Sequence, residues 1–133
     1  MLAYVQDVPA GWCGFGVRDR MKRLTRSRTI PVIDESPVWS IFCLTVRVGY
    51  RRLGLARALL DSLIEYAREN GAPALEAYPV DPDGRRIHTT AAYVGTTSMF
   101  EDAGFHRVMQ TEARSARLPR WLMRLDLRER TRE

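Results

Sequence analysis

Two small residues and three arginines lie at the point where an apolar run gives way to a helical pattern. Gly54 and Ala56 are two positions apart, and Arg51, Arg52 and Arg57 surround them. The first turn of a helix has backbone N–H groups without acceptors and the positive end of the helix dipole. Small side chains let a pyrophosphate approach those amides, and the arginines add positive charge. The arrangement therefore predicts a phosphate-binding turn at the start of a helix.

This stretch differs from two widespread phosphate motifs. The dinucleotide fingerprint needs three glycines within six residues, and the nucleoside-triphosphate loop ends in Gly-Lys-Ser/Thr; neither is present. A single glycine at a strand-to-helix turn can also serve only to change the direction of the chain. The local pattern alone leaves both interpretations open.

Few other residues have the types and spacing of a reactive site. Cys13 and Cys43 both lie in apolar, strand-like runs, and we expect them to be free thiols buried in neighbouring strands. His88 and His106 are far from each other and from the cysteines in the sequence. The sequence therefore predicts no metal site.

Length and composition indicate one globular domain. The chain has 133 residues, of which 45% are hydrophobic and 28% charged, and we take 1–133 as a single domain with a frayed end at about 128–133. No apolar run reaches the roughly 18 residues of a membrane span. The first residues lack the basic start and apolar stretch of a signal peptide. We therefore expect a cytoplasmic protein with no membrane partner.

The chain is basic and rich in arginine. Its net charge is +5, and of 21 basic residues only Lys22 is a lysine, which leaves 20 arginines. A polyanionic partner would explain this charge. However, aromatic residues that could stack on bases are not interleaved with the arginines. We therefore expect most arginines to lie on solvated faces, and we expect no nucleic-acid partner.

The first third of the sequence predicts strands. Leu2–Val5 and Trp12–Val17 predict a hairpin whose turn is Gln6–Gly11. The charged run Arg18–Arg28 predicts a mobile loop or a short helix. Val38–Val46 is apolar along almost its whole length, which predicts a central strand covered on both faces.

A helix follows the arginine–glycine turn. From about Gly54 to Asn70, apolar residues at four-residue spacing form one stripe: Leu55, Leu59, Leu63 and Ala67. The remaining predictions are a strand, a polar loop, a short helix and two final strands: Ala74–Val80, Asp81–Thr90, Gly95–Ala103, Phe105–Met109 and Trp121–Leu127. The order β-β-β-α-β-α-β-β predicts a mixed α/β (α+β) domain.

The sequence RRLGLA, read as Arg-x-x-Gly-x-Ala, resembles the acyl-CoA signature Gln/Arg-x-x-Gly-x-Gly/Ala of the GNAT superfamily of N-acetyltransferases. An apolar strand ending at Val46 precedes it, and SMFEDAGF resembles the superfamily's helix-glycine-phenylalanine ending. The likeness extends from about Ala3 to Leu127. It implies a mixed, mostly antiparallel central sheet flanked by helices, with acetyl-CoA as the cosubstrate.

The resemblance also implies a cofactor site. In the family, the amides of the signature hold the pyrophosphate of CoA, and the end of the preceding strand pairs with the pantetheine arm and stabilises the oxyanion. Arg52 occupies a position where glycine is common, which leaves the geometry of the turn open. The implied cofactor-binding residues are Leu44, Thr45, Val46, Arg51, Arg52, Leu53, Gly54, Leu55, Ala56 and Arg57.

The catalytic residues are less clearly marked. Acyl transfer to an amine needs a neutral amine and a proton for the leaving thiolate. Many family members supply that proton from a tyrosine, but the corresponding residue here is Phe100. Tyr93 stands where relatives often have a CoA-contacting asparagine; it is the candidate acid, and a cap on the preceding loop is its other interpretation.

Glu76 is the candidate base or amine-recognition group. It is a carboxylate in an otherwise apolar strand, where a charged group needs a reason. An exposed strand face would also explain it. Deprotonation of the amine through solvent would need no dedicated base.

The family normally begins with a strand and two helices ahead of the hairpin that starts here at Leu2. Three expectations follow: the true start lies upstream, a neighbouring subunit fills the space, or the acceptor side is open. An open sheet edge and an apolar face favour association. A homodimer is therefore expected.

The implied function is transfer of an acetyl group from acetyl-CoA to a primary amine of an acceptor that the sequence does not identify. The alternative is a CoA-binding module with little or no turnover. Two departures from the family favour the alternative, namely Phe100 in place of tyrosine and the absent front end.

Overall fold

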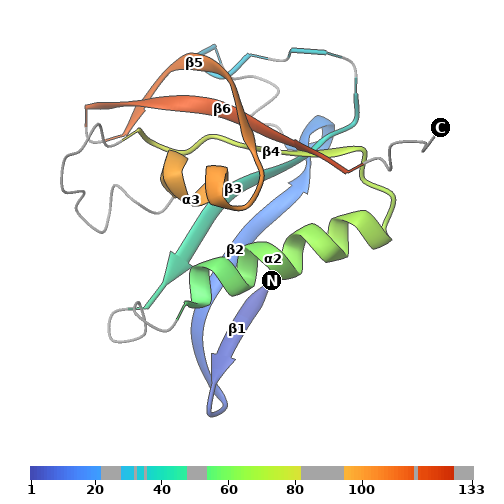
Figure 1. Cartoon of the computed structure of the whole chain (residues 1–133), viewed down its shortest axis with the longest axis vertical. Coiled ribbons are helices and arrows are strands. Elements are labelled where there is room, and N and C mark those ends of the chain that lie inside the picture. Colours follow the sequence, from blue (N-terminus) through green and yellow to red (C-terminus); the bar gives the residue numbers. More distant parts are fainter. Residues whose placement is uncertain are drawn as a thin grey trace.

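The computed structural model describes residues 1–21, 28–31, 33–34, 36–47, 54–81, 95–115 and 117–127. Its strands form one six-stranded sheet in the order β1-β2-β3-β4-β6-β5, and two helices lie on the same side of it (Figure 1). All pairings are antiparallel except the parallel pairing of β3 with β4. The predicted mixed, mostly antiparallel sheet flanked by helices is thus confirmed. The elements are β1 Leu2–Val5, β2 Val8–Val17, η1 Arg18–Arg20, β3 Trp39–Val46, α2 Leu55–Glu69, β4 Ala74–Ala77, α3 Thr97–Asp102, β5 His106–Ser115 and β6 Leu118–Asp126.

β1 and β2 form the predicted hairpin, but its turn is shorter than the sequence suggested. Gln6 and Asp7 both have positive φ, 47° and 65°, which is the backbone of a tight two-residue turn. Strand β2 therefore begins at Val8, earlier than predicted. Pro9 and Gly11, which were expected in the turn, pair with β1 instead.

β3 changes its neighbours along its length. It pairs with β2 from Trp39 to Val46, whereas β4 pairs only with Trp39–Ile41. We call Phe42–Val46 the outer half of β3. The sequence predicted a strand covered on both faces, but Phe42 is 44% exposed, so this prediction was wrong for the outer half.

β4 is short because the chain after it turns to other partners. All four of its residues are buried, and its regular ladder ends at Ala77, before Pro79, which has no N–H to donate. Val80 then makes isolated bridges with Thr96 and Arg120. The predicted strand Ala74–Val80 is therefore correct in place but shorter in the structure, and β3 runs on beyond its end.

Helix α2 covers the sheet with the predicted apolar stripe. It shares one core with β2, β3 and β4 and with Phe100 and Phe105, whose rings meet edge to face at 5.0 Å between centroids. Full burial of one leucine side chain stabilises a fold by about 1.5–3 kcal/mol, so this core fixes both helices on the sheet. The buried residues of α2 are Leu59, Leu60, Leu63, Ile64 and Ala67.

The chain between β2 and β3 covers part of the opposite face of the sheet. The sequence predicted a mobile loop or a short helix here, and Arg18–Arg20 forms a short 3-10 helix. Residues 22–27 lie outside the described part. Ile30 packs with Tyr78, Ala113 and Leu122 in a second, smaller core. The two faces of the sheet are thus covered by different parts of the sequence.

β5 and β6 form one hairpin that is longer than the two predicted strands. The tight connection between them contains Arg117, whose φ is 66°. The second half of β5 was not recognised as strand because its inward residues are small or polar. Thr111 and Ala113 are buried there, with exposed Glu112 between them. The alternation of a strand is present, but without large apolar residues to mark it.

Both cysteines are free, as expected, but only Cys13 is buried. Burial, with a smaller contribution from Cys43, raises the pKa of the Cys13 thiol to about 12. Cys43 is half-buried and lies on the opposite face, over Gly14. The expectation that both thiols are buried was wrong for Cys43, because the outer half of β3 is bare on that face.

Candidate functional site

Helix α2 begins at a left-handed glycine. Gly54 is the N-cap residue, with φ 71° and ψ 18°, and it has no side chain to cap the helix. A Cβ built on Gly54 would meet no atom of the described residues within 4 Å. A ligand group can therefore lie directly against the backbone of this turn. The sequence placed Gly54 inside the helix, but the structure places it just before the first helical residue.

The first turn of α2 offers three backbone amides. The first hydrogen bond of the helix runs from the Ala58 amide to the Gly54 carbonyl at 3.0 Å. The amides of Leu55, Ala56 and Arg57 consequently have no acceptor within the helix. With the positive end of the helix dipole, they favour an anion at this position.

The side chains of this turn also have roles of their own. Ala56 packs against the main core, so its small size serves packing as well as access. The Arg57 Nε donates to Asp61 Oδ1 at 2.9 Å in an exposed ion pair. The other three residues of the predicted signature, Arg51, Arg52 and Leu53, lie outside the described residues.

The outer half of β3 meets the first turns of α2 over Gly11. A Cβ on Gly11 would lie 2.9 Å from the Thr45 carbonyl oxygen and 3.3 Å from the side chain of Leu59. Only glycine permits this close approach of strand and helix. The side chain of Leu44 is buried in the core, so only its backbone can face a ligand. The structure thus brings Leu44–Val46 close to the helix that Gly54 begins.

Glu76 lies in a buried polar network on the other face of the sheet. Only 2% of the residue is exposed. Its Oε1 accepts a hydrogen bond from the Tyr78 hydroxyl at 3.1 Å and lies 3.7 Å from the Arg18 Nε. Its Oε2 accepts from Arg124 Nη2. The Tyr78 hydroxyl also bonds the Ser40 hydroxyl at 2.8 Å, so five side chains share this network.

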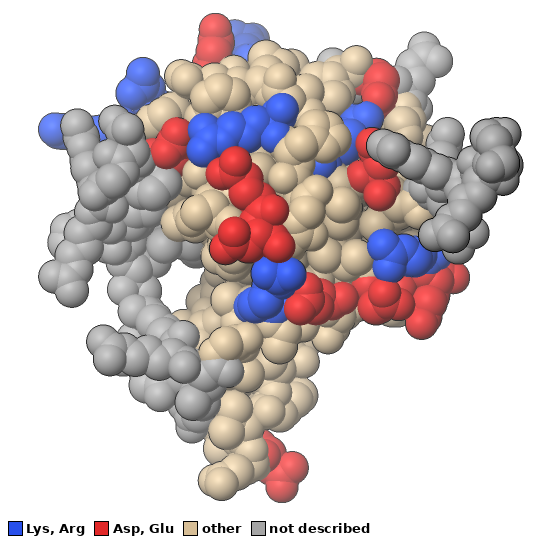
Figure 2. All heavy atoms as spheres, viewed as in Figure 1, with Lys and Arg blue, Asp and Glu red and all other residues tan. Residues whose placement is uncertain are grey.

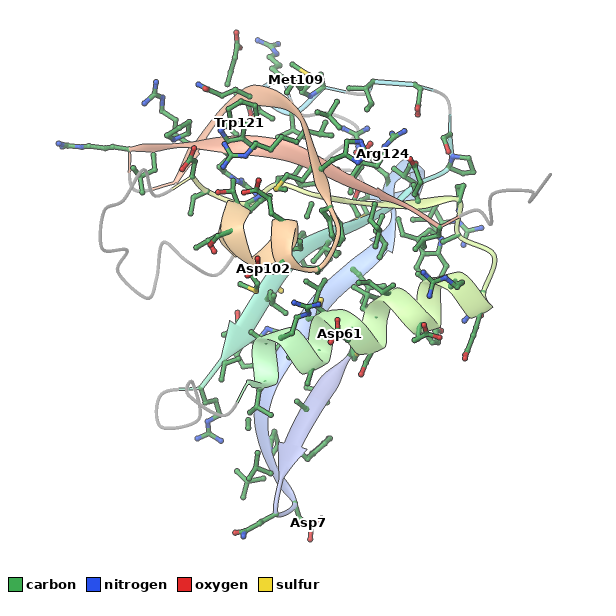
Figure 3. The ribbon with its side chains drawn as sticks, viewed as in Figure 1. Asp7, Asp61, Asp102, Met109, Trp121 and Arg124 are labelled. Carbon is green, nitrogen blue, oxygen red and sulfur yellow. The ribbon has the colours of Figure 1, made fainter. Side chains whose placement is uncertain are left out.

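The two arginines connect Glu76 to the chain that crosses this face. Arg124, on β6 (Figure 3), donates to the two carboxylate oxygens of Asp34 at 2.6 and 3.2 Å. The hydrogen bonds that Arg124 donates to Asp34, and then those to Glu76, raise the pKa of Arg124. Arg18 donates to the carbonyl oxygens of Ile30 and Pro31 at 3.3 Å. Glu76 therefore anchors the segment that covers the second face.

The model of one family fits the chain. The model of the acetyltransferase (GNAT) family matches residues 1–95, well over half of the sequence. The chain belongs to this family. The family uses acetyl-CoA as its acyl donor.

Solved structures share the GNAT fold of this chain. A GNAT-family protein from Desulfovibrio desulfuricans has 20% identity and a TM-score of 0.62, with 96% of this chain and 67% of that chain covered. The ribosomal-protein-S18-alanine N-acetyltransferase of Escherichia coli has 20% identity and a TM-score of 0.59 over 96% and 67%. The Salmonella typhimurium protein yncA, solved with its cofactor acetyl-CoA, has 18% identity and a TM-score of 0.63 over 99% and 66%.

At these identities the likeness shows the fold alone. This GNAT chain spans about two thirds of the length of the solved structures it matches. No curated protein sequence matches it.

A buried phenylalanine occupies the position where many GNAT members have a tyrosine. Phe100 is fully buried within the main core. A Cβ on Gly95, whose φ is 82°, would lie 2.6 Å from the Phe100 ring, so the glycine makes room for it. Tyr93, the candidate acid, lies outside the described residues. Its role stays a prediction.

Glu76 does not lie on an exposed strand face, so that explanation of its presence was wrong. Two arginines compensate the buried carboxylate, as a buried charge requires. Glu76 stands opposite Ser40 in the sheet. Along β3, Ser40 and Val46 are about 20 Å apart at about 3.3 Å per residue. A donor bound at α2 would have to extend along β3 for its acyl end to come near Glu76.

The partners of Glu76 were not predicted from the sequence. Ser40, Glu76 and Arg124 are polar residues of β3, β4 and β6, and they stand opposite one another in the sheet. Polar residues among the apolar residues of these strands were the available signal. Their common register could not be read from the sequence, because it depends on which strands are neighbours.

Charges of both signs are interspersed on the face that carries the helices (Figure 2). They include the pairs Arg57–Asp61, Arg68–Glu65 and Arg107–Glu101. This face therefore has no field of a single sign among its described residues. The same residues contain no group of three metal-ligating side chains, and none of the described helices is long and apolar enough to cross a membrane.

We predict that Tyr78 makes stability depend on alkaline pH. Burial, and then the neighbouring Glu76, raises the pKa of Tyr78 from 10.0 to about 12. Its contribution is complete below pH 10 and is lost as the pH rises to about 12, because the unfolded chain releases the proton first. Urea unfolding across this range should show a loss on the order of 2 kcal/mol from this group.

Tyr78→Phe should make that pH dependence shallower. Tyr66→Phe is the matched control, because Tyr66 is 45% exposed and also retains its ring in the variant. Equal slopes in the wild type and Tyr78→Phe would contradict the role of the buried hydroxyl.

Proposed function

We propose that this chain transfers the acetyl group of acetyl-CoA to a primary amine of an acceptor. The observation that carries the proposal is the left-handed Gly54 at the start of α2, whose Cβ position has none of the described atoms within 4 Å. A helix start of this kind suits a phosphate group. Membership of the GNAT family supports the same use of this turn.

The donor site combines this turn with the outer half of β3. The amides of Leu55, Ala56 and Arg57 would hold the pyrophosphate, together with the amides of Arg52 and Leu53. Arg51 and Arg52 add positive charge in the sequence beside it. The backbone of Leu44–Val46 would bind the pantetheine arm, because β4 ends before it could pair with this part of β3. Acetyl-CoA supplies the thioester whose carbonyl carbon the amine attacks.

The reaction then requires two proton transfers. The attacking amine loses one, and the leaving thiolate gains one. We assign the second step to Tyr93, since Phe100 has no hydroxyl. Glu76 is the proposed base or amine-recognition group. However, both of its carboxylate oxygens already accept hydrogen bonds, one from Tyr78 and one from Arg124. Deprotonation through solvent is the alternative to Glu76.

Two structural relatives suggest which amines to test first. One is an N-acetyltransferase of the ribosomal protein S18 alanine, and another is the NatC complex bound to Gag peptide and CoA, at 16% identity and a TM-score of 0.64. We therefore include the N-terminal amines of peptides beside small primary amines as acceptors. We also propose a cytoplasmic location and a homodimer.

A CoA-binding module with little or no turnover is the second candidate. The burial of Phe100 in the core favours it, because a hydroxyl donor is absent at the position where many relatives have one. The engagement of Glu76 by two arginines favours it as well. Both candidates share the donor site and differ in turnover.

Gly54→Ala should abolish most of the stabilisation that acetyl-CoA gives. The added methyl group would occupy the space beside the turn, and a ligand that binds only the folded state raises the melting temperature by mass action. The variant should also lose about 1–2 kcal/mol of stability, because an alanine is strained in the left-handed region. Thermal unfolding with and without acetyl-CoA measures both effects.

Gly71→Ala is the matched control at the other end of α2. Gly71 has φ 78°, and a Cβ there also meets nothing within 4 Å in the part of the chain that the structure describes. It should cost similar stability and leave the shift caused by acetyl-CoA unchanged. Equal shifts of the melting temperature by acetyl-CoA in Gly54→Ala and Gly71→Ala would contradict a donor site at this turn.

The acetyl-transfer proposal is tested by release of free thiol from acetyl-CoA against a panel of amines and peptides. We expect Tyr93→Phe to lower turnover by about 10²–10⁴-fold with little change in binding of acetyl-CoA. Binding of acetyl-CoA without turnover of any acceptor would favour the CoA-binding module. A gain of turnover in Phe100→Tyr would then show that the missing hydroxyl was the limiting defect.

A further inference from the structure

The turn of the β5–β6 hairpin carries two arginines that no carboxylate neutralises. Arg114 and Arg117 are both exposed. The Arg114 guanidinium donates to the Arg117 carbonyl oxygen at 3.3 Å, so its charge lies against the turn. The ion pairs formed among the described residues include neither arginine. On the helix face, by contrast, Arg57 and Arg68 are each paired with an acid.

A third arginine lies at the edge of the same hairpin. The Glu112 amide on β5 donates to the Thr29 carbonyl oxygen at 3.1 Å, so the segment that contains Thr29 runs beside this strand. Arg28 is the preceding residue, and it is exposed. Like the other two, it forms no ion pair with a described acid. We call Arg28, Arg114 and Arg117 the basic hairpin end.

The acids near the basic hairpin end do not cancel its charge. Asp81 joins the hairpin through its amide, which donates to the Pro119 carbonyl oxygen at 3.0 Å. Its carboxylate, however, accepts from Arg107 at 3.0 Å. Glu112 is exposed, and it forms no ion pair with a described residue. Three guanidinium groups therefore stand against one such carboxylate, and the surplus charge favours an anionic ligand.

The basic hairpin end and the outer half of β3 lie on two arms of the sheet. The parallel strands β3 and β4 separate after Ile41 and Ala77, and we call this point the fork. The outer half of β3 is one arm. The chain after β4 forms the other arm with β6, because Val80 bridges to Arg120. Both arms extend to the same side of the molecule, and the β5–β6 turn lies apart from the end of β3 (Figure 1).

The distance from the fork to the turn decides the length of the ligand. Ala77 stands opposite Met123, and Arg117 follows six residues away along the hairpin. Six residues of strand span about 20 Å at about 3.3 Å each. A carboxylate on the carbon that carries an amine is only about 3–4 Å from that amine. In an extended peptide, side chains four to six places into the sequence lie about 10–18 Å from the N-terminal amine.

We propose that the basic hairpin end recognises acidic side chains of a peptide acceptor, four to six places after its N-terminal amine. This inference rests on the proposed function, because a donor bound along the outer half of β3 directs its acyl end to the fork. The amine then lies at the fork and the acidic side chains lie at the turn. Guanidinium groups suit carboxylates because they donate two parallel hydrogen bonds to the two oxygens.

A nucleic acid suits this surface less well than an acidic peptide. Proteins that bind single strands stack the bases on aromatic rings. The stretch Arg114–Arg120 contains no aromatic residue. Trp121, which follows it, packs against the main core with the Arg107 guanidinium 4.9 Å from its ring centre. A peptide carboxylate needs only the charges and donors that the basic hairpin end has.

Binding of two peptides to the protein saturated with CoA tests the recognition without requiring turnover. The peptides AGAEEEG and AGAQQQG carry a C-terminal fluorescein, and fluorescence anisotropy gives the Kd of each. We expect the acidic peptide to bind roughly 3–10-fold more tightly, since exposed ion pairs are individually weak. The difference should shrink as salt is added, because salt screens exposed charges.

The double variant Arg114→Gln/Arg117→Asn should lose this preference. Glutamine keeps a donor for the turn, and asparagine tolerates the left-handed backbone at Arg117, whose φ is 66°. Arg20→Gln/Arg68→Gln is the matched control, because it removes the same charge from exposed positions outside the hairpin. The control should keep the preference. Circular dichroism checks that both variants are folded.

Equal Kd values for the two peptides in the wild type would overturn the proposal. So would a preference that survives in the hairpin variant or disappears in the control. An unlabelled oligothymidine of eight nucleotides is the competitor in the same assay. If it displaced the acidic peptide at a lower concentration than unlabelled AGAEEEG does, the surface would be assigned to nucleic acid instead.

Release of free thiol from acetyl-CoA is measured with the same two peptides, without the label. Selective binding of AGAEEEG with no thiol release would contradict only the proposed function. Thiol release with equal kcat/KM for both peptides would contradict only the recognition of acidic side chains.

Discussion

The parallel pairing of β3 with β4 lasts for only three residue pairs, and the candidate site depends on this limit. Within those pairs β4 is held on one face by the helix core and on the other by the network at Glu76. After Ala77 comes Pro79, and Val80 then bridges to Thr96 and to Arg120 of β6. β3 continues past β4, and its outer half meets the first turns of α2 over Gly11.

The buried network contributes more to register than to net stability. A buried ion pair is roughly neutral against a well-packed apolar alternative, whereas loss of one partner costs about 3–5 kcal/mol. Ser40, Glu76 and Arg124 stand opposite one another on three neighbouring strands. A slip of one residue would send the carboxylate into the apolar core without its arginines. The network therefore fixes where β4 ends along β3, and with it the part of β3 that β4 does not pair with.

The sequence predicted those elements whose apolar pattern matches their burial. The stripe of α2, the first part of β3 and the glycine at the start of α2 were all recognisable, and with them the family. The start of β2 was missed because Pro9 and Gly11 resemble turn residues, and much of the β5–β6 hairpin was missed because Thr111 and Ala113 face inward. The partners of Glu76 come from distant parts of the chain, so their meeting is a property of the fold.

We propose above all that the start of α2 and the outer half of β3 form one binding surface for acetyl-CoA. Backbone amide chemical shifts during a titration with acetyl-CoA test it most directly. We expect the largest changes at the amides of Leu55, Ala56 and Arg57 and along Leu44–Val46, with little change along β5. Changes centred on β5, or a spectrum unaltered by excess acetyl-CoA, would contradict it.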